Sequence, residues 1–586
     1  MTKPAVAAPT IYQLTIERFR GISKLIWNPA AGVNVLLGGG DVGKTTILDA
    51  IGLLFSPTNG IAVQDTDYNG RREEDGFLIE AIVAFPDGGG INNLMRPAWP
   101  WAWNGSEALI PDHKDDGATA GEEVYRLRVS GTADLELSYE IVQPSGTTDS
   151  FPVSLRRMIG LVRLSGDDRN DRDLRLVQGS ALDRLLSDKG MRSRMASELA
   201  KSDIRSKLAD EARAALVQLD TAFRTRQLPG DLDIAITGGQ GASIASMVGL
   251  TAKKDAVQLP LSSWGAGTRR LSALAIAEQL QGGSPITLVD EVERGLEPYR
   301  QRVLMEKLQE GRSQTFITTH SPAAISSSSK AALWYVDHAG GIGQLDGKKV
   351  SLLREADPEA FLARLTIVAE GATEVGFVSA LLERALGVAL RSAGIHVADG
   401  GGHDTTIEIL EALAAGGLRF GGFADDEGRH PTRWAAVQAK LAGLLFRWKA
   451  GDLEANAFTA VPETEFEALL EDPEGTKTGW RLRTLADRLG IAEKDFPSIR
   501  AAAGTTLRQL MLDAAHGTVP AGADDKVKKE FKGHAQAWFK TVAGGRELET
   551  KVFKLGAWPT LKDELLPFCD AIRLAAGLSV LSDLPA

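Results

Sequence analysis

The sequence holds two separate sets of residues whose types and spacing could do chemistry. The first is the run GGGDVGKTT at 38–46, between an apolar strand pattern at 33–37 and an apolar helix pattern at 45–55. Glycines let main-chain amides approach a phosphate, and the start of a helix adds positive potential. Lys44 would then reach the β- and γ-phosphates and Thr45 would bind Mg²⁺. The run predicts a nucleotide site with these contacts: Gly38, Gly40, Asp41, Gly43, Lys44, Thr45 and Thr46.

Three later segments narrow the class of nucleotide-binding protein. The apolar run ITLV ends in Asp290, expected to hold Mg²⁺ through water, and Glu291, expected to polarise the attacking water. His320 ends TFITTH, where its imidazole could sense the γ-phosphate. The segment LSSWGAGTRRLSALAIA at 261–277 places Ser263, Gly265 and Gly267 ahead of a helix pattern. A solvated acidic turn and a structural histidine are the ordinary alternatives for single segments. The combined order resembles the ABC-type ATPases, and ERFRG at 17–21 resembles the opening strand of their chromosome-maintenance and recombination branch.

The second set is a group of carboxylates in the C-terminal half. The strand pattern LTIVA leads to Glu370, with Glu374 four residues later, and RFGGFADDEG places Asp425, Asp426 and Glu427 after another strand pattern. AFTAVPE at 457–463 predicts a third strand, followed by further acids: Glu463, Glu465 and Glu467. Acids that end parallel strands meet at one edge of the sheet. Such a cluster suits Mg²⁺ or Mn²⁺, and two such ions support phosphodiester hydrolysis. Helix caps and solvated loop acids are the alternative for any one segment.

The pattern EG-x2-E followed by DDE resembles a Toprim domain, with Glu427 where Asp is usual. An ABC-type ATPase followed by a Toprim domain resembles the OLD family of ATP-dependent nucleases. The resemblance implies these metal ligands, with the last two from the third strand: Glu370, Glu374, Asp425, Glu427, Glu465 and Glu467. It also implies a lysine of the helical tail at the scissile phosphate, and we favour Lys540 over Lys551 and Lys532.

The same resemblance implies cofactors and partners. The cofactors are ATP and Mg²⁺, with Mn²⁺ or Ca²⁺ as alternatives at the Toprim site. Two ATPase heads would sandwich ATP, so we expect a homodimer or higher oligomer. DNA is the expected substrate, no membrane is involved, and members of the family act in phage defence, sometimes beside a helicase-like partner protein.

The expected fold class is α/β, with an N-terminal ABC-type ATPase domain and a C-terminal Toprim domain. The ATPase would comprise 1–165 and 227–355, interrupted by a helical insertion at 166–226 that could serve dimerisation. The Toprim domain would span 362–475 and a helical C-terminal part 476–586. The stretch 97–122, rich in Trp, Gly and Asp, predicts a loop or insertion.

Composition sets limits on these expectations. The 586 residues carry 66 Lys plus Arg against 77 Asp plus Glu, a net charge of −11. This balance argues against a generally cationic nucleic-acid coat, although DNA needs only a local basic groove, for which Arg156, Arg157 and the lysines at 526–529 are candidates. The single cysteine, Cys569, excludes a disulfide framework and a cysteine-based zinc finger. No apolar run approaches the ~20 residues of a membrane span, and MTKPAVAAPT does not resemble a signal peptide, so we expect a soluble cytoplasmic protein.

Two other functions stay open at this stage. A non-cleaving ATP-driven DNA clamp would use the acidic block only as a binding module. A Toprim nuclease that acts on RNA is the second alternative.

Overall fold

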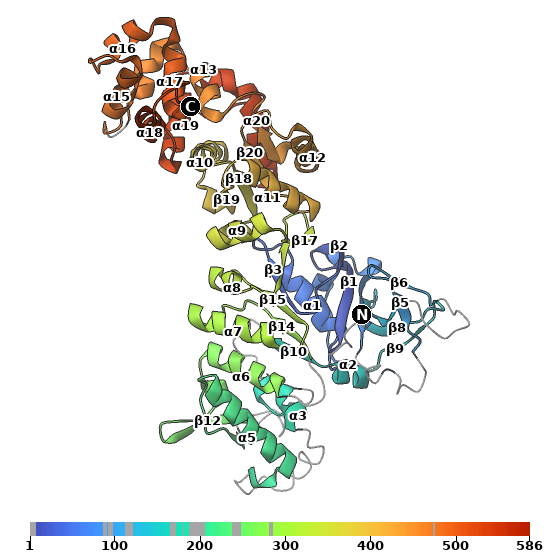
Figure 1. Ribbon diagram of the computed structural model, residues 1–586. Helices are drawn as coiled ribbons and strands as arrows, with labels where there is room; N and C mark the ends of the chain where they lie inside the picture. The colour runs from blue at the N-terminus through green and yellow to red at the C-terminus, as the bar shows by residue number, and fades with distance from the viewer. Residues whose placement is uncertain are drawn as a thin grey trace. The chain divides into compact units, whose positions relative to one another are not determined.

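A computed structural model describes residues 8–85, 91, 98–111, 121–164, 172–177, 180–186, 205–236, 248–279, 285–472 and 475–585. The chain divides into two compact units (Figure 1). The first comprises Met1–Leu37 with Asp41–Val336, and the second comprises Gly38–Gly40 with Asp337–Ala586. Both units combine helices and sheets, which confirms the mixed α/β fold class. Within the described part of the chain, no helix has the length and apolar character needed to cross a membrane.

The N-terminal unit contains a twisted antiparallel sheet with the strand order β2-β1-β4-β7-β5-β6, to which β8 adds on β7 and β9 on β8. Its strands are β1 (Thr10–Phe19), β2 (Ile22–Trp27), β4 (Phe77–Ala84), β5 (Trp101–Trp103), β6 (Ala108–Leu109), β7 (Glu122–Gly131), β8 (Leu137–Val142) and β9 (Thr148–Ser150). The prediction of a loop or insertion over 97–122 therefore missed the two short strands β5 and β6. Strand β5 pairs with β7, Trp101 opposite Val124, but three residues are too few to give a periodic signal.

A parallel sheet forms the core of the same unit, in the order β10-β14-β15-β3-β16. Its strands are β10 (Leu161–Leu164), β14 (Ile286–Val289), β15 (Thr315–Thr318), β3 (Val33–Leu37) and β16 (Ala332–Val336). All but β10 and β16 have wholly buried side chains, as expected of strands covered on both faces. The register sets Ile317 between Val289 and Val35. The loops after β14, β15 and β3 therefore leave from one edge of the sheet.

Helices of the N-terminal unit flank its sheets or pack on the helices that do (Figure 1). They are α1 (Lys44–Leu54), α2 (Val153–Ile159), α3 (Ala181–Leu186), α5 (Asp210–Thr225), α6 (Ala266–Glu278), α7 (Pro298–Glu310) and α8 (Pro322–Ser326). A small antiparallel sheet adds β11 (Asp233–Ile236), β12 (Val248–Lys254) and β13 (Val257–Pro260). Helices α3 and α5 belong to the predicted insertion at 166–226, and α5 buries Leu216, Leu219 and Phe223 where it packs with α3 and α6. The insertion residues 187–204 lie outside the described part.

The C-terminal unit is built on a parallel sheet with the order β19-β18-β20-β21. These strands are β18 (Leu365–Ala369), β19 (Ile395–Asp399), β20 (Gly421–Ala424) and β21 (Leu445–Arg447); β17 (Ile342–Gln344) comes earlier in the chain. Its helices are α9 (Lys348–Ala356), α10 (Ala372–Leu386), α11 (His403–Ala415), α12 (Pro431–Leu441), α13 (Leu453–Ala460), α14 (Phe466–Leu470), α15 (Thr478–Leu489), α16 (Phe496–Ala503), α17 (Leu507–His516), α18 (Asp525–His534), α19 (Val542–Lys554) and α20 (Trp558–Ala575).

The predicted strand at 457–463 is wrong, because this segment lies mostly in helix α13. The strand that completes the sheet is β21, which is only three residues long. Helix α13 buries Leu453, Ala457 and Phe458, and a short helix with so much apolar surface looks like a buried strand in sequence. One hydrophobic core runs from β18 through the helical tail to Leu584. The tail is therefore part of the same folding unit as the sheet.

Candidate functional sites

The glycine-rich run forms a tight turn between β3 and α1. Gly43 precedes the helix with φ 95° and Gly38 has φ 130°, both in the region that favours glycine, while Asp41 has φ 59°. Lys44 is the first helical residue and is buried. Burial lowers the pKa of Lys44 to about 8, although Glu293 and Asp290 oppose this shift. Like these two acids, a phosphate at this turn would favour the charged ammonium of Lys44, and a nucleotide site requires that charge.

The loop after β14 places its acids beside this turn. Asp290 accepts hydrogen bonds through Oδ1 from Thr45 Oγ1 at 3.2 Å and Thr318 Oγ1 at 2.6 Å. Glu291 has φ 50° and its amide donates to Thr318 Oγ1 at 2.8 Å, so its half-exposed carboxylate projects from a strained turn. The side-chain oxygens of Asp290 and Thr45 thus lie together, and oxygen ligands of this kind suit Mg²⁺.

His320 lies at the same edge, after β15. Its amide donates to Glu293 Oε1 at 2.7 Å, and Thr319 Oγ1 donates to Glu293 Oε2 at 2.7 Å. Burial and the nearby Lys44 lower the pKa of His320, so the imidazole is neutral at neutral pH. Glu293, which the sequence analysis missed, therefore ties the histidine loop to the acidic loop.

The predicted signature residues lie at the start of α6. Ser263 and Gly265 are exposed, whereas Gly267 is buried against the loop after β14. A Cβ added to Gly267 would come 2.2 Å from the carbonyl oxygen of Gly295. Arg270, buried on α6, donates to the carbonyls of Glu291 at 2.8 Å and Arg294 at 2.9 Å, and also to that of Asp290. Arg270 therefore ties helix α6 to the acidic loop, and the exposed Ser263 and Gly265 lie just before this helix.

A carboxylate cluster forms at the C-terminal edge of the second parallel sheet. Glu370 follows β18, Glu374 lies on α10, Asp425 follows β20, and Asp452 and Glu454 follow β21. Burial, then repulsion from Glu454, raises the pKa of Glu374 to about 7. Burial, then repulsion from Glu374 and Glu370, raises the pKa of Asp425 to about 9. Without a cation this cluster retains protons at neutral pH.

The chemistry of the cluster fits a divalent cation. Glu454 is 1% exposed, and its Oε2 has no hydrogen-bond partner among the described residues. The five acids offer carboxylate oxygens, which Mg²⁺ and Mn²⁺ prefer, and His516 offers a nitrogen within 4.8 Å of ligand atoms of Asp452 and Glu454. A bound cation would offset both the repulsion and the burial.

Lys540 is the predicted lysine that contacts this cluster. Its Nζ lies 2.7 Å from Glu454 Oε1. Burial alone would lower its pKa, but Glu454, Glu374 and Asp452 raise it, so the ammonium persists. Lys551 is buried and donates to the carbonyls of Ala468 at 2.7 Å and Glu471, which is a structural role. Lys532 is exposed on α18.

The other predicted acids have different surroundings. Glu465 ends a short 3-10 turn beyond α13 and Glu467 lies on α14, so neither follows a strand that would carry it to the cluster. They were assigned to it because 457–463 was predicted as a strand. Asp426 accepts from Arg447 Nη2 and is occupied by that contact. Glu427 is exposed and 3.1 Å from Arg429, yet a carboxylate oxygen lies within 4.8 Å of ligand atoms of Glu370 and His403.

The sequence analysis missed several members of this site. Asp452 caps α13 through the Ala455 amide at 2.8 Å and lies 2.9 Å from His516 Nε2. Glu454 lies two residues further on. The signal was available, because LLFRW is a short apolar run followed by a turn and acids, the same order as at Glu370 and Asp425. His403, next to Glu370, gave no such signal.

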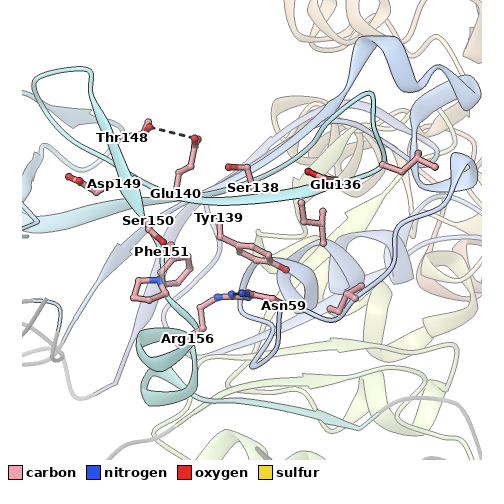
Figure 2. A pocket seen from close by; sticks show the side chains of 14 residues that line it. Asn59, Glu136, Ser138, Tyr139, Glu140, Thr148, Asp149, Ser150, Phe151 and Arg156 are labelled. Atoms are coloured by element: carbon pink, nitrogen blue, oxygen red, sulfur yellow. Dashed lines mark hydrogen bonds between the residues drawn. The ribbon is translucent and has the colours of Figure 1, made fainter. Parts of the chain in front are cut away.

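Arg156 is not available as a phosphate contact. Its guanidinium is buried, lies 3.6 Å from the centre of the Tyr139 ring, and donates to the Ser56 carbonyl at 2.8 Å (Figure 2). It lines the floor of a cavity of about 650 Å³ under β8 and β9. Arg157 Nε donates to the Pro57 carbonyl at 2.9 Å. The lysines at 526, 528 and 529 are exposed on α18, and their contact with phosphate stays a prediction.

Comparisons with known proteins match both halves of the chain. Residues 138–326 match a family described as "AAA domain, putative AbiEii toxin, Type IV TA system". Residues 361–425 match the overcoming lysogenization defect protein-like Toprim domain. No curated protein matches the sequence.

Among solved structures, the chain is similar to an Smc head bound to the C-winged-helix domain of ScpA, at 15% identity over 58% of this chain and 99% of that one, with a TM-score of 0.38. It is also similar to the recombination mediator protein RecF with ATPrS, at 14% identity over 59% and 100%, with a TM-score of 0.36. An Smc head derived from Pyrococcus furiosus gives 14% identity over 59% and 99%, with a TM-score of 0.36. The two family models carry the assignment: the chain joins an ATPase domain to an OLD-like Toprim domain, the domain pair of OLD-family ATPase–Toprim proteins.

Proposed function

We propose that this chain is an ATP-hydrolysing, metal-dependent DNA endonuclease of the OLD type. The observation that carries the proposal is the buried carboxylate cluster beside Lys540, in which Asp425 and Glu374 have raised pKa values. Such a cluster costs stability unless a cation binds there, so cation binding is the function that best accounts for it. We propose the sequence boundaries given above as the division into ATPase, insertion, Toprim domain and helical tail.

The carboxylates would hold Mg²⁺ or Mn²⁺, and the bound ions would activate a water and stabilise the leaving oxygen in phosphodiester hydrolysis. The ligands we propose are Glu370, Glu374, Asp425, Asp452 and Glu454, with Glu427 at the exposed margin. Lys540 remains charged beside Glu454 and is partly exposed, so its Nζ can donate to a phosphate oxygen. Glu454 holds that ammonium in place, which gives the lysine a fixed direction.

The N-terminal site would bind Mg·ATP through the turn at 38–46. Thr45 and Asp290 would hold Mg²⁺, Glu291 would polarise water, and His320 would sense the γ-phosphate. The exposed Ser263 and Gly265 fit a role in contacting ATP on a second head, so we propose a homodimer. ATP would then control DNA access to the Toprim site. The resemblance extends the proposal to phage defence in the cytoplasm, in some systems with a helicase-like partner protein.

A plasmid-nicking assay tests the proposal. Wild type should nick supercoiled DNA with Mg²⁺ or Mn²⁺, whereas Asp425→Asn and Glu454→Gln should not. Glu465→Gln is a matched control, since it removes a nearby acid outside the cluster, and it should retain activity. Cleavage of RNA but not DNA would favour an RNA nuclease. ATP hydrolysis with DNA binding but no cleavage under either metal would favour the non-cleaving clamp.

A further inference from the structure

A buried histidine lies beside the carboxylate cluster and has no role in the mechanism described so far. His403 is the first residue of α11, after the three-glycine turn that follows β19, and is 5% exposed. Its ring is in contact with Glu370 on one side and Trp434 of α12 on the other. Trp434 is also buried, with the Arg447 guanidinium 5.5 Å from its ring centre. The histidine is therefore held on both sides.

The contact with Trp434 decides which nitrogen of His403 carries the proton. The indole Nε1 of Trp434 lies 3.3 Å from His403 Nε2. An indole nitrogen can only donate, so His403 Nε2 accepts and its lone pair is used. In the neutral ring the proton is then on Nδ1, which lies 3.3 Å from Glu370 Oε2 and donates to it.

These bonds also distinguish the two oxygens of Glu370. Oε2 accepts from His403 Nδ1 and, at 3.1 Å, from the amide of Asp425. With two donors on Oε2, the carboxylate is fixed in rotation and Oε1 is the oxygen left for a cation. A carboxylate or histidine oriented by a second hydrogen-bond partner is typical of metal sites.

A role for His403 as a metal ligand is the competing reading. Ligand atoms of Glu370, His403 and Glu427 do lie within 4.8 Å of one another. A histidine ligand must offer a nitrogen lone pair, however, and His403 has none to offer. Its Nε2 lone pair accepts from Trp434, and its Nδ1 carries the proton given to Glu370. The hydrogen bonds thus favour positioning over ligation.

We propose that His403 is a positioning residue, which orients Glu370 through its Nδ1–H and is itself oriented by Trp434. This inference rests on the proposed function, since it assumes that Glu370 binds a metal ion. Loss of the His403 donor should weaken metal affinity by about 10-fold to 100-fold, the range usual for partners of metal ligands. Cleavage at saturating metal should change much less, because the ligands and Lys540 remain.

Three substitutions test the proposal in the full-length chain. His403→Leu removes the donor, and His403→Asn keeps a donor at the position of Nδ1. Trp434→Phe keeps an aromatic ring, smaller than the indole, but removes the N–H that fixes the proton position. His430→Asn is the matched control, because His430 stacks 6.4 Å from His403 yet pairs with Asp404 at the surface. Mn²⁺ binding without nucleotide, measured by EPR against Asp425→Asn as background, gives a readout independent of cleavage.

The expected result is weaker Mn²⁺ binding for His403→Leu, an intermediate loss for Trp434→Phe, and near wild-type binding for His403→Asn and His430→Asn. The Mg²⁺ concentration for half-maximal nicking should rise in the same order. Folding is checked by thermal unfolding with EDTA. If folded His403→Leu binds Mn²⁺ as wild type does, the positioning role is wrong while the metal site stands. If His403→Asn is as weak as His403→Leu, the hydrogen bond to Glu370 is not the cause. If wild type shows no Mn²⁺ binding above background, the proposed function itself fails.

Discussion

Replacing Asp425 by asparagine should stabilise the metal-free protein while abolishing cleavage. The pKa of Asp425 is raised from 3.8 to about 9, first by burial and then by Glu374 and Glu370. Between these two values the unfolded chain has released the proton while the folded chain retains it. The unfolded state then binds fewer protons, so stability falls as pH rises through this interval. At neutral pH the interval covers about 3 pKa units, which at ~1.36 kcal/mol per unit is about 4 kcal/mol as an order of magnitude.

The assay is thermal unfolding of the full-length chain in EDTA at several values between about pH 5 and pH 8.5. Asparagine has no proton to lose and can still accept from the Leu453 amide, which bonds Asp425 Oδ1 at 3.0 Å. The gain in Tm from Asp425→Asn should therefore grow with pH, reaching several degrees at the alkaline end. Added Mg²⁺ should stabilise wild type more as pH rises, because the cation displaces the proton, and this increment should be lost in the variant.

Asp452 supplies a control of opposite sign in the same cluster. Burial alone would raise its pKa, but hydrogen bonds from His516 and the Ala455 amide lower it. Its ionised form contributes stability above the unfolded pKa, and this contribution is lost as pH falls through the folded pKa. Asp452→Asn should therefore destabilise the metal-free protein at neutral pH.

The reasoning about Asp425 is refuted if Asp425→Asn lowers the Tm of the metal-free protein, or if the gain in Tm from this substitution is the same at pH 5 and pH 8.5.

Three further tests, two of them with a matched control variant, separate structural from catalytic roles. Arg270→Lys keeps the positive charge, but a lysine cannot donate to the same set of carbonyls. The rate of ATP hydrolysis should therefore fall about 10-fold, which corresponds to a loss of about 1.4 kcal/mol, while nucleotide binding measured by fluorescence is retained. An unchanged rate of hydrolysis would contradict this role. Gly545→Ala would place a Cβ 1.9 Å from a carbonyl oxygen of α10, so the free energy of unfolding in urea should fall by about 1–3 kcal/mol. Gly533→Ala on α18 is the control: its Cβ would meet open space, so the free energy of unfolding should stay the same or rise. Lys540→Met should abolish nicking with Mn²⁺ binding intact, and Lys551→Met should instead lower Tm with nicking per folded molecule retained.

The parts of the molecule that were predicted best are those whose residue pattern lies within one short segment of the sequence. The turn at 38–46, its preceding strand and its following helix lie within one short segment, and each element has its own residue pattern. The same is true of Glu370, which follows a strand of buried apolar residues. Such strands are recognisable because parallel strands covered on both faces are apolar throughout.

The missed strand shows where that reasoning fails. β21 has three residues, one of them Arg447, so its apolar signal is weak. Helix α13 follows β21 after a short turn, and it is apolar enough to resemble a strand. The sequence analysis therefore placed the third strand in this segment. As a result, the sequence analysis looked for the third group of acids at Glu465 and Glu467, whereas Asp452 and Glu454 are the acids that follow β21. One segment assigned to the wrong element thus changed which acids were predicted as the third group of ligands.

Residues that act through tertiary contacts gave no sequence signal. His403 and Arg270 are defined by what they touch: one bonds a carboxylate from another strand, and the other bonds main-chain carbonyls of a distant loop. Main-chain carbonyls carry no residue identity, so the sequence does not show which carbonyls Arg270 contacts. Residues of this kind are found only once the chain is folded.

The carboxylate cluster and Lys540 are brought together by a close contact between α10 and α19. A Cβ on Gly376 would lie 1.9 Å from the Val542 carbonyl, so glycine is required for the helices to approach this closely. Glu374 precedes that contact on α10, and Lys540 precedes it on the segment that leads into α19. The same approach sets Lys540 against Glu454 at 2.7 Å. A chain cut after 475 would lose this partner and leave Glu454 as an unpaired buried carboxylate, which costs several kcal/mol, about 3–5 in comparable cases. The change in sequence pattern near 475 therefore separates two kinds of sequence within one compact unit.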